Sequence, residues 1–269
     1  MKKSIFFGDT DLFSIKGEQV CKEYDDYGNV TVTDDRKYRI MSFYSIYEQT
    51  RMRIDTPFLP VHNYIKAMLM GITLSPADSV LILGLGGGSL VRALDHYDPS
   101  LKVSVVELRK TVLNVARKYF SLPENNNITY HIDDAEAFIS RQSGKSYSHI
   151  FSDLYTADAM LPLQENTLFF DSCIRNLRPD GWLILNYHQM PALNSPLFTS
   201  LINQFRTVLY CRVPSGNVVL YCSDKTDLAD LTVLRKTLSA TGTLFSCDFW
   251  PLARTLASLK DKVCSKSAI

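Results

Sequence analysis

Hydrophobic and polar positions change their periodicity near residue 60 of the chain. Before this point apolar and polar side chains alternate, with turn residues such as Asp-Asp-Tyr-Gly-Asn between the runs, which is typical of antiparallel strands. The strands are predicted at 20–24, 30–33 and 38–43. Residues 45–60 contain two prolines and are predicted to be irregular, and a helix is predicted over 63–70.

From residue 80 onward, apolar runs of strand length alternate with segments of helix length. The predicted strands are 80–83, 102–108, 128–132, 147–151 and 182–186, and the helices that follow them are 90–97, 111–120, 135–141, 167–177 and 197–207. A hairpin is predicted from 208–213 and 217–223, and two more helices from 228–239 and 251–262. This order predicts an α/β fold with a doubly wound, Rossmann-like sheet, whose ligand binds at the carboxyl ends of the strands.

The sequence SVLILGLGGGS, residues 79–89, joins the first of these strands to its helix. Its glycines are Gly84, Gly86, Gly87 and Gly88. Glycines at this place let the backbone turn tightly and approach a ligand, while the next helix aims its N-terminus at the same point. The run is an imperfect GxGxxG, so by itself it is equally compatible with a nucleotide site and with a plain tight turn.

Acidic residues follow the next three strands. Glu107 comes about 20 residues after the glycines, where nucleotide-binding folds place the acid that receives ribose hydroxyls. Asp133, Asp134 and Ala135 follow the third strand, and Asp153 follows the fourth. Singly, Glu107 or Asp134 could simply cap the next helix. Together with the glycines, these acids predict a nucleoside-binding crevice.

Composition narrows the possible partners. The formal net charge of +1 gives no electrostatic reason to expect nucleic acid or an anionic membrane as a partner. No apolar run approaches the roughly 20 residues that span a bilayer. The six cysteines form no CxxC pair and have no zinc-ligand spacing, so we expect reduced thiols in a cytoplasmic protein, and no metal.

The glycine turn alone does not distinguish NAD from S-adenosylmethionine as the nucleoside. An acid after the third strand can accept a hydrogen bond from the adenine amino group, which favours S-adenosylmethionine. The antiparallel hairpin at the end of the predicted sheet also favours S-adenosylmethionine over NAD. We therefore expect a fold of the S-adenosylmethionine-dependent methyltransferase type with a small β-rich region over 1–60 and the Rossmann-like nucleoside-binding domain, with its C-terminal helices, over 61–269.

The chain resembles the spermidine synthases, which are polyamine aminopropyltransferases, over nearly its whole length. The segments that carry the resemblance are GLGGGSLVRAL, VVELRKTV, ITYHIDDAEAFI, HIFSDLYTADAMLPL, LRPDGWLILN and PSGNVVLYCSDK. They stand where that family has GGGDGGxxRE, VEID, GDG or DDA, DSSDP, an L-x-x-DG strand and YPSG. The resemblance implies a small-molecule acceptor and a protein that forms homodimers or tetramers.

The resemblance also implies which residues hold the nucleoside, namely S-adenosylmethionine, its decarboxylated form or methylthioadenosine. Glu107 would hold the ribose hydroxyls, and Asp134 with Ala135 would hold the adenine. The remaining nucleoside contacts would come from the glycine turn and from the N-terminal side: Gly84, Gly86, Gly87, Gln49 and Tyr64. Asp153 matches the first Asp of DSSDP and would accept the proton of the nucleophile.

The departures from the family gather in the polyamine site. The Asp of GGGDGG is Gly87 here, a polyamine-binding Glu is Val61, the second Asp of DSSDP is Thr156, and the Tyr of YPSG is Val213. A dicationic amine buried without carboxylate partners costs several kcal/mol. Ordinary transfer to putrescine is therefore not expected.

Three functions follow from these residues. The first is transfer of an aminopropyl or methyl group to a small acceptor. The second is methyl transfer proper, because the loss of an acid at Gly87 would leave room for the methionine carboxylate near Ser89. The third is a catalytically silent nucleoside-binding protein. Tyr155 and His188 are expected either to line the acceptor pocket or to serve in packing.

Overall fold

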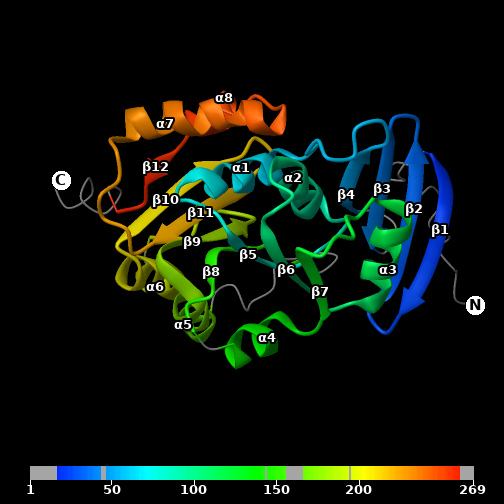
Figure 1. Cartoon of the computed structure of the whole chain (residues 1–269), viewed down its shortest axis with the longest axis horizontal. Coiled ribbons are helices and arrows are strands. Elements are labelled where there is room, and N and C mark those ends of the chain that lie inside the picture. Colours follow the sequence, from blue (N-terminus) through cyan, green and yellow to red (C-terminus); the bar gives the residue numbers. More distant parts are fainter. Residues whose placement is uncertain (1–16, 44–46, 143, 156–165, 194, 261–269) are drawn as a thin grey trace, which may run out of the picture.

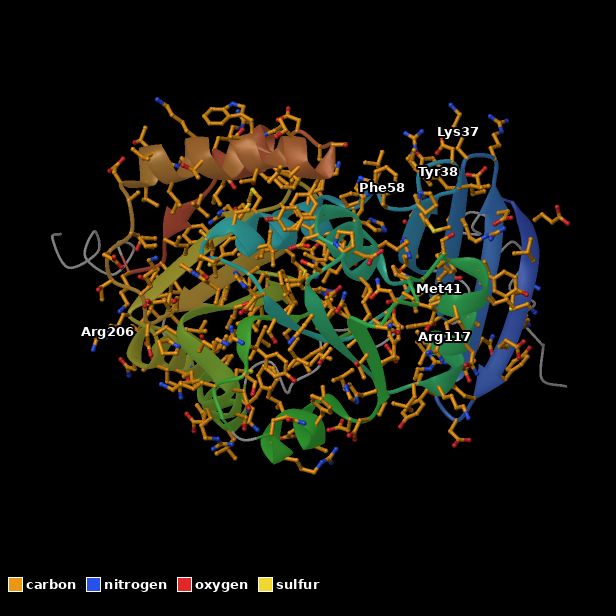
Figure 2. All side chains as sticks on the ribbon, viewed as in Figure 1. Lys37, Tyr38, Met41, Phe58, Arg117 and Arg206 are labelled. Atoms are coloured by element: carbon orange, nitrogen blue, oxygen red, sulfur yellow. The ribbon has the colours of Figure 1, made fainter. Side chains whose placement is uncertain are left out.

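The N-terminal part of the chain forms a four-stranded antiparallel sheet. The computed structural model describes residues 17–43, 47–142, 144–155, 166–193 and 195–260. The strands β1 (Glu18–Asp25), β2 (Gly28–Asp35), β3 (Tyr38–Phe43) and β4 (Tyr47–Arg53) pair in chain order (Figure 1). In Figure 2, Met41 marks the buried side of this sheet, whereas Lys37 at the β2–β3 turn is exposed.

The prediction of irregular structure over 45–60 is wrong for β4. Its sequence, YEQTRMR, is mostly polar, so strand propensity alone gives little signal. Thr50 and Met52 are nevertheless buried, because pairing with β3 turns that face of the strand inward. The prolines that suggested irregular structure, Pro57 and Pro60, come only after the strand has ended.

The second sheet has eight strands in the order β12-β10-β11-β9-β8-β5-β6-β7. Its parallel strands are β5 (Ser79–Leu83), β6 (Lys102–Glu107), β7 (Ile128–Ile132), β8 (Tyr147–Ser152) and β9 (Leu177–Tyr187). The hairpin of β10 (Thr207–Arg212) and β11 (Val218–Ser223) joins through an antiparallel β11–β9 pair. The doubly wound order confirms the predicted fold class. The order changes direction at β5, and a ligand crevice is expected beside the carboxyl end of that strand.

Helices cover both faces of this sheet (Figure 1). One apolar cluster joins α1 (Asn63–Met70), α2 (Ser89–Tyr97), α3 (Lys110–Tyr119), α7 (Leu231–Ala240) and α8 (Trp250–Ala253). A second cluster joins α4 (Ala135–Arg141), α5 (Thr167–Asn176) and α6 (Pro196–Gln204). Short 3-10 turns, η2 (Gly71–Thr73) and η4 (Thr241–Phe245), follow α1 and α7. No described helix is long and apolar enough to cross a membrane.

The helix predicted over 251–262 is wrong beyond Ala253. After α8 the chain turns and adds β12 (Ala257–Ser258) to the edge strand β10. Leu256 belongs to the first apolar cluster and Leu259 to the second, so the two are buried on opposite faces of the sheet. A helix would place residues three apart on one face, so it could not bury both. Residues 261 and 262 lie outside the described residues.

The four-stranded sheet packs against the α3 side of the larger sheet (Figure 1). Val30, Val32 and Met41 of the small sheet belong to the same apolar cluster as Val105 of the larger sheet and Val112 of α3. The predicted division into two domains at residue 60 therefore stays a prediction. The packing of the two sheets matters for function, because it brings β4 and the β1–β2 turn to the carboxyl ends of β5 and β6.

Candidate functional site

A cavity of about 1090 Å³ opens at the carboxyl ends of the parallel strands. Its lining includes every residue that the sequence placed in the nucleoside site or at the reacting centre, apart from Gly87: Gln49, Tyr64, Gly84, Gly86, Glu107, Asp134, Ala135 and Asp153. The fold thus brings together residues that lie up to about a hundred positions apart in the chain, as expected for strand ends on one edge of a sheet.

The glycine turn between β5 and α2 needs glycine for two different reasons. Gly84 has a φ of +92°, and a β-carbon there would overlap the carbonyl oxygen of Asp153. Gly88 also has a positive φ, +78°, and precedes the first residue of α2. These conformations are open to glycine and strained for other residues. The turn therefore lets the ends of β5 and β8 approach each other at the floor of the cavity.

Gly87 is placed differently from the expectation. Its N–H donates to Thr50 Oγ1 over 2.9 Å, and a β-carbon at Gly87 would overlap the Thr50 methyl group and come within 3.2 Å of Phe120. The space beside Gly87 is filled, so the expectation that it leaves room for a ligand carboxylate is wrong. Thr50 lies on β4, and sequence reasoning missed it.

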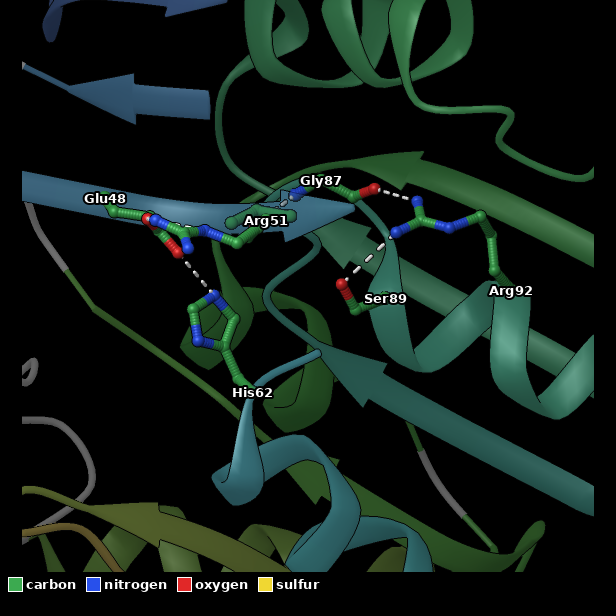
Figure 3. A network of polar contacts seen from close by, with 7 residues as sticks. Glu48, Arg51, His62, Gly87, Ser89 and Arg92 are labelled. Atoms are coloured by element: carbon green, nitrogen blue, oxygen red, sulfur yellow. Dashed lines mark hydrogen bonds and ion pairs between the residues drawn. The ribbon is translucent and has the colours of Figure 1, made fainter. Parts of the chain in front are cut away.

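Arg92 holds the other side of the same turn (Figure 3). This side chain on α2 is only 4% exposed and donates to the backbone carbonyls of Pro57, Gly87 and Phe120 and to the hydroxyl of Ser89. Burial lowers the pKa of Arg92 to about 9. The buried guanidinium therefore fixes the backbone of the glycine turn, and no carboxylate in the described part of the chain pairs with it.

Glu107 connects two backbone segments at the end of β6. Its carboxylate accepts hydrogen bonds from the N–H of Leu85 (3.1 Å) and the N–H of Arg109 (2.8 Å). Burial raises its pKa above the ordinary value, although these hydrogen bonds oppose the shift. Glu107 does not cap a helix, because the residue at the start of α3 is Arg109, which makes no side-chain cap. The carboxylate faces the cavity and can accept further donors.

Asp134 does cap a helix, as one reading of the sequence predicted. Its Oδ1 accepts from the N–H of Ala137 in the first turn of α4 over 2.9 Å. The side chain is exposed and lines the cavity, so the second oxygen is open to a ligand. The neighbouring Asp133 is paired with Arg141. Capping and ligand binding are therefore compatible at Asp134.

Asp153 lies at the end of β8 and is held by a chain of amides. Asn186 Nδ2 donates to Asp153 Oδ1 (2.9 Å), and Asn217 Nδ2 donates to Asn186 Oδ1 (3.1 Å). Ser215 in turn donates to Asn217 from the β10–β11 turn. Burial raises the pKa of Asp153 to about 6, against the opposing effects of Asn186 and His62. A carboxylate with this pKa is suited to accepting a proton near neutral pH.

Glu48 is a cavity carboxylate that sequence reasoning missed. It lies on β4, and Arg51 Nε donates to its Oε2 (3.0 Å), while His62 Nε2 lies 3.1 Å from its Oε1 (Figure 3). Burial alone would raise the pKa of Glu48, but His62 and Arg51 outweigh it and hold the pKa below its ordinary value. The Glu48 carboxylate at the cavity is therefore already paired with Arg51 and His62. The His62 ring also stacks on Tyr64 with centroids 5.5 Å apart.

Tyr155 and His188 line the same end of the cavity. Their rings stack with centroids 4.6 Å apart, and the Tyr155 hydroxyl donates to the backbone carbonyl of Asn186. Val213, which stands where the resemblance implies a tyrosine, is buried. Tyr155 thus supplies a phenol at this end, while Thr156 lies outside the described residues.

The charge of the cavity is strongly unbalanced. Among the described residues that line it, six carry carboxylates and one, Arg109, carries a guanidinium. Arg109 is itself paired with Asp25 at 2.8 Å. A cavity with this balance attracts cations and ligands rich in hydrogen-bond donors, and it disfavours anions such as phosphates.

The chain matches known proteins over most of its length. The model of the Spermine/spermidine synthase domain matches residues 61–221. A polyamine aminopropyltransferase of Chromobacterium violaceum is 30% identical over 220 residues, which cover 77% of this chain and 81% of that protein.

Two solved structures show the same fold. A probable spermidine synthase from Corynebacterium glutamicum superposes with a TM-score of 0.71 at 17% identity and covers 84% of this chain and 87% of its own. Human methyltransferase-like protein 13, solved in complex with SAH, superposes with a TM-score of 0.62 at 22% identity and covers 69% of this chain and 93% of its own.

Proposed function

This chain belongs to the spermine/spermidine synthase family, and its relative from Chromobacterium violaceum is a transferase, so we propose that this chain is a transferase too. In this proposal it transfers an alkyl group from an S-adenosyl sulfonium nucleoside to an amine. The observation that carries the proposal is the acidic cavity, which joins a nucleoside end around Glu107 and Asp134 to an acceptor end around Asp153. The sulfonium is a cation, and an amine acceptor is a cation before it reacts, so both suit this charge.

At the nucleoside end, Glu107 accepts the ribose hydroxyls, and Asp134 accepts the adenine amino group through the oxygen that does not cap α4. Gly84 and Gly86 form the floor beneath the ligand, and Gln49 and Tyr64 contact it from the N-terminal side. Glu107 is oriented before any ligand binds, because two backbone N–H groups already hold it. This preorganisation lowers the cost of ordering the site on binding.

At the acceptor end, the ammonium of the acceptor gives one proton to Asp153. The neutral amine nitrogen then attacks the carbon attached to sulfur, a new C–N bond forms, and the C–S bond electrons leave with sulfur as a neutral thioether. The reaction is an in-line displacement, so holding the two reactants in position supplies much of the rate. Asn186 aligns Asp153 by donating to one of its oxygens and leaves the other for the acceptor.

The acceptor is not a putrescine-like diamine in this proposal. A second ammonium would need a second carboxylate, and Glu48 is already paired with Arg51 and His62. Leaving a buried ammonium without a partner costs several kcal/mol. An acceptor with one reacting amine and a polar, uncharged remainder fits the amides of Asn186 and Asn217.

One observation favours methyl transfer as the second candidate. Thr50 fills the space where an acid at position 87 would hold the amine of an aminopropyl group. Ser89, the first residue of α2, lines the cavity, and the N-terminus of α2 favours a ligand carboxylate on the cavity side of Ser89, apart from the filled space beside Gly87. Against this, the lining offers no unpaired cation among the described residues, which favours the decarboxylated nucleoside.

Calorimetric titration with S-adenosylmethionine, its decarboxylated form and methylthioadenosine tests the proposal. We expect methylthioadenosine to bind, and the preference between the two sulfonium nucleosides to identify the transferred group. Mass spectrometry of products formed from labelled nucleoside and an amine library then identifies the acceptor. Failure of all three nucleosides to bind would overturn the proposed function.

A further inference from the structure

The tip of the β1–β2 hairpin, residues 25–28, reaches the nucleoside end of the cavity. Asp26 and Tyr27 line the cavity together with Leu108, which follows Glu107 in the chain. Tyr27 is 51% exposed and Leu108 is 41% exposed, so both present apolar surface to an open space. Neither is part of the glycine turn or of the strand-end acids. The N-terminal sheet therefore supplies a wall to the nucleoside end.

Arg109 fixes this wall to the larger sheet. Its guanidinium donates to both carboxylate oxygens of Asp25 (2.8 and 3.0 Å) and to the carbonyl of Gly28 (2.9 Å). It also lies 4.6 Å from the ring centroid of Phe43 and is only 9% exposed. Bidentate pairing of this kind sets orientation as well as energy. The hairpin tip is therefore held in one place rather than left free.

The same residue connects the tip to the ribose-binding acid. The backbone N–H of Arg109 donates to Glu107 Oε1, while its side chain holds Asp25. Within the tip, Asp25 Oδ1 also accepts from the N–H of Tyr27 over 2.9 Å, which fixes the turn. One hydrogen-bonded path thus runs from Glu107 through Arg109 and Asp25 to the backbone of Tyr27.

We propose that the hairpin tip is a purine-binding wall of the nucleoside site, in which Tyr27 covers the face of the base and Asp26 accepts a hydrogen bond from a donor on the base or ribose. Arg109 and Asp25 are positioning residues that hold this wall. The proposal rests on the proposed function, because it takes the ligand to be an adenine nucleoside. The hairpin tip then contributes to affinity for the nucleoside without contributing to the transfer step.

Calorimetric titration with methylthioadenosine tests this wall directly. An aromatic stacking contact is worth about 1 kcal/mol beyond area burial, so we expect Tyr27→Ala to raise the Kd about fivefold and Tyr27→Phe to change it little. Asp25→Ala frees the tip and is expected to raise the Kd several-fold. Hydrogen exchange of the amides at 25–28 is expected to slow when methylthioadenosine binds to the wild-type protein.

The chain offers a matched control in Asp34→Ala. Asp34 pairs with Arg39 at 2.6 Å, and Arg39 donates to the carbonyl of Tyr119, so this pair also ties the small sheet to α3. Neither residue lines the cavity. We expect Asp34→Ala to lower the unfolding temperature as much as Asp25→Ala does while leaving the Kd within about twofold of wild type.

The outcomes separate the two proposals. If the wild-type protein binds methylthioadenosine and Tyr27→Ala binds it equally well, the wall is overturned and the proposed function stands. Equal Kd values for Asp25→Ala and Asp34→Ala would overturn the positioning role. Absence of wild-type binding to methylthioadenosine and to both sulfonium nucleosides would overturn the proposed function and the wall with it.

Discussion

The hydroxyl of Thr50 accepts a hydrogen bond from the N–H of Gly87, and the methyl group of the same threonine fills the space that a side chain at Gly87 would need. β4 therefore seals the glycine turn from the N-terminal side. An acid at position 87 would overlap Thr50, so a single substitution there cannot place a carboxylate in the cavity.

Replacing Gly87 with alanine tests this packing. We expect Gly87→Ala to lower the free energy of unfolding by about 1–3 kcal/mol, because the added methyl overlaps Thr50 in a filled space. Thr50→Ser removes the clashing methyl and keeps the hydroxyl that accepts from Gly87. The double variant should recover part of the loss in urea unfolding. Strict additivity of the two substitutions would contradict direct contact.

The raised pKa of Asp153 predicts that the free energy of unfolding falls as the pH rises. Its pKa is about 6 in the folded protein and about 3.9 in an unfolded chain, so its contribution is fully present below pH 3.9 and is lost as the pH rises through 6. Asp153→Asn removes this loss and should be more stable than wild type by about 3 kcal/mol at pH 8, with a smaller difference at pH 5. Urea unfolding at several pH values measures the difference.

Asp98→Asn provides the comparison for Asp153. Hydrogen bonds from Ser100 hold the pKa of Asp98 below its ordinary value, so the stability contributed by Asp98 is present at neutral pH and lost in acid. The difference between Asp98→Asn and wild type should therefore change only below about pH 4, with the opposite sign to the change that Asp153→Asn shows between about pH 4 and 6. A flat difference between Asp153→Asn and wild type from pH 5 to 8 would contradict the raised pKa.

The strand-end acids could be predicted from the sequence because the sheet topology fixes where strands end. Glu107, Asp134 and Asp153 each follow an apolar run, and parallel strands place such residues on one edge. Glu48 and Thr50 could not be found in this way. They lie on a polar strand whose existence depends on pairing with β3, and they reach the cavity only through the way the small sheet packs.

The burial of Arg92 beside the glycine turn could not be predicted from the sequence either. Arg92 lies on an amphipathic helix, where an arginine is ordinarily expected on the solvent face. The structure buries it because three backbone carbonyls near the turn need a donor. Such a role depends on three segments meeting in space. The pattern of polar and apolar residues does not reveal such a meeting of segments.

Arg92→Lys tests the support of the glycine turn. A single ammonium cannot reach three carbonyls that a guanidinium reaches, and each buried carbonyl left without a donor costs about 1–3 kcal/mol. We expect the free energy of unfolding to fall by about 2–4 kcal/mol and methylthioadenosine binding to weaken. Arg117→Lys, which alters an exposed pair with Glu124, should change stability by less than about 1 kcal/mol. Equal effects in thermal unfolding would contradict the role of Arg92.

Because Arg51 pairs with Glu48, we predict that a substitution at Arg51 changes which acceptor the cavity prefers. Arg51→Gln removes one of the two partners of the Glu48 carboxylate and frees its Oε2, which then faces the cavity together with Asp153. Two carboxylates suit a diamine, so we expect putrescine to bind about tenfold more tightly in the presence of methylthioadenosine, as calorimetry would measure.

Two control variants make the Arg51 experiment specific. Arg53→Gln makes the same charge change two residues further along β4, at an arginine whose partner is the exposed Asp55. It should leave putrescine binding unchanged. Glu48→Gln added to Arg51→Gln should return binding to the wild-type level, because the freed charge is gone. Equal gains in Arg51→Gln and Arg53→Gln would show that general charge, rather than the pairing of Glu48, limits the binding of a second ammonium.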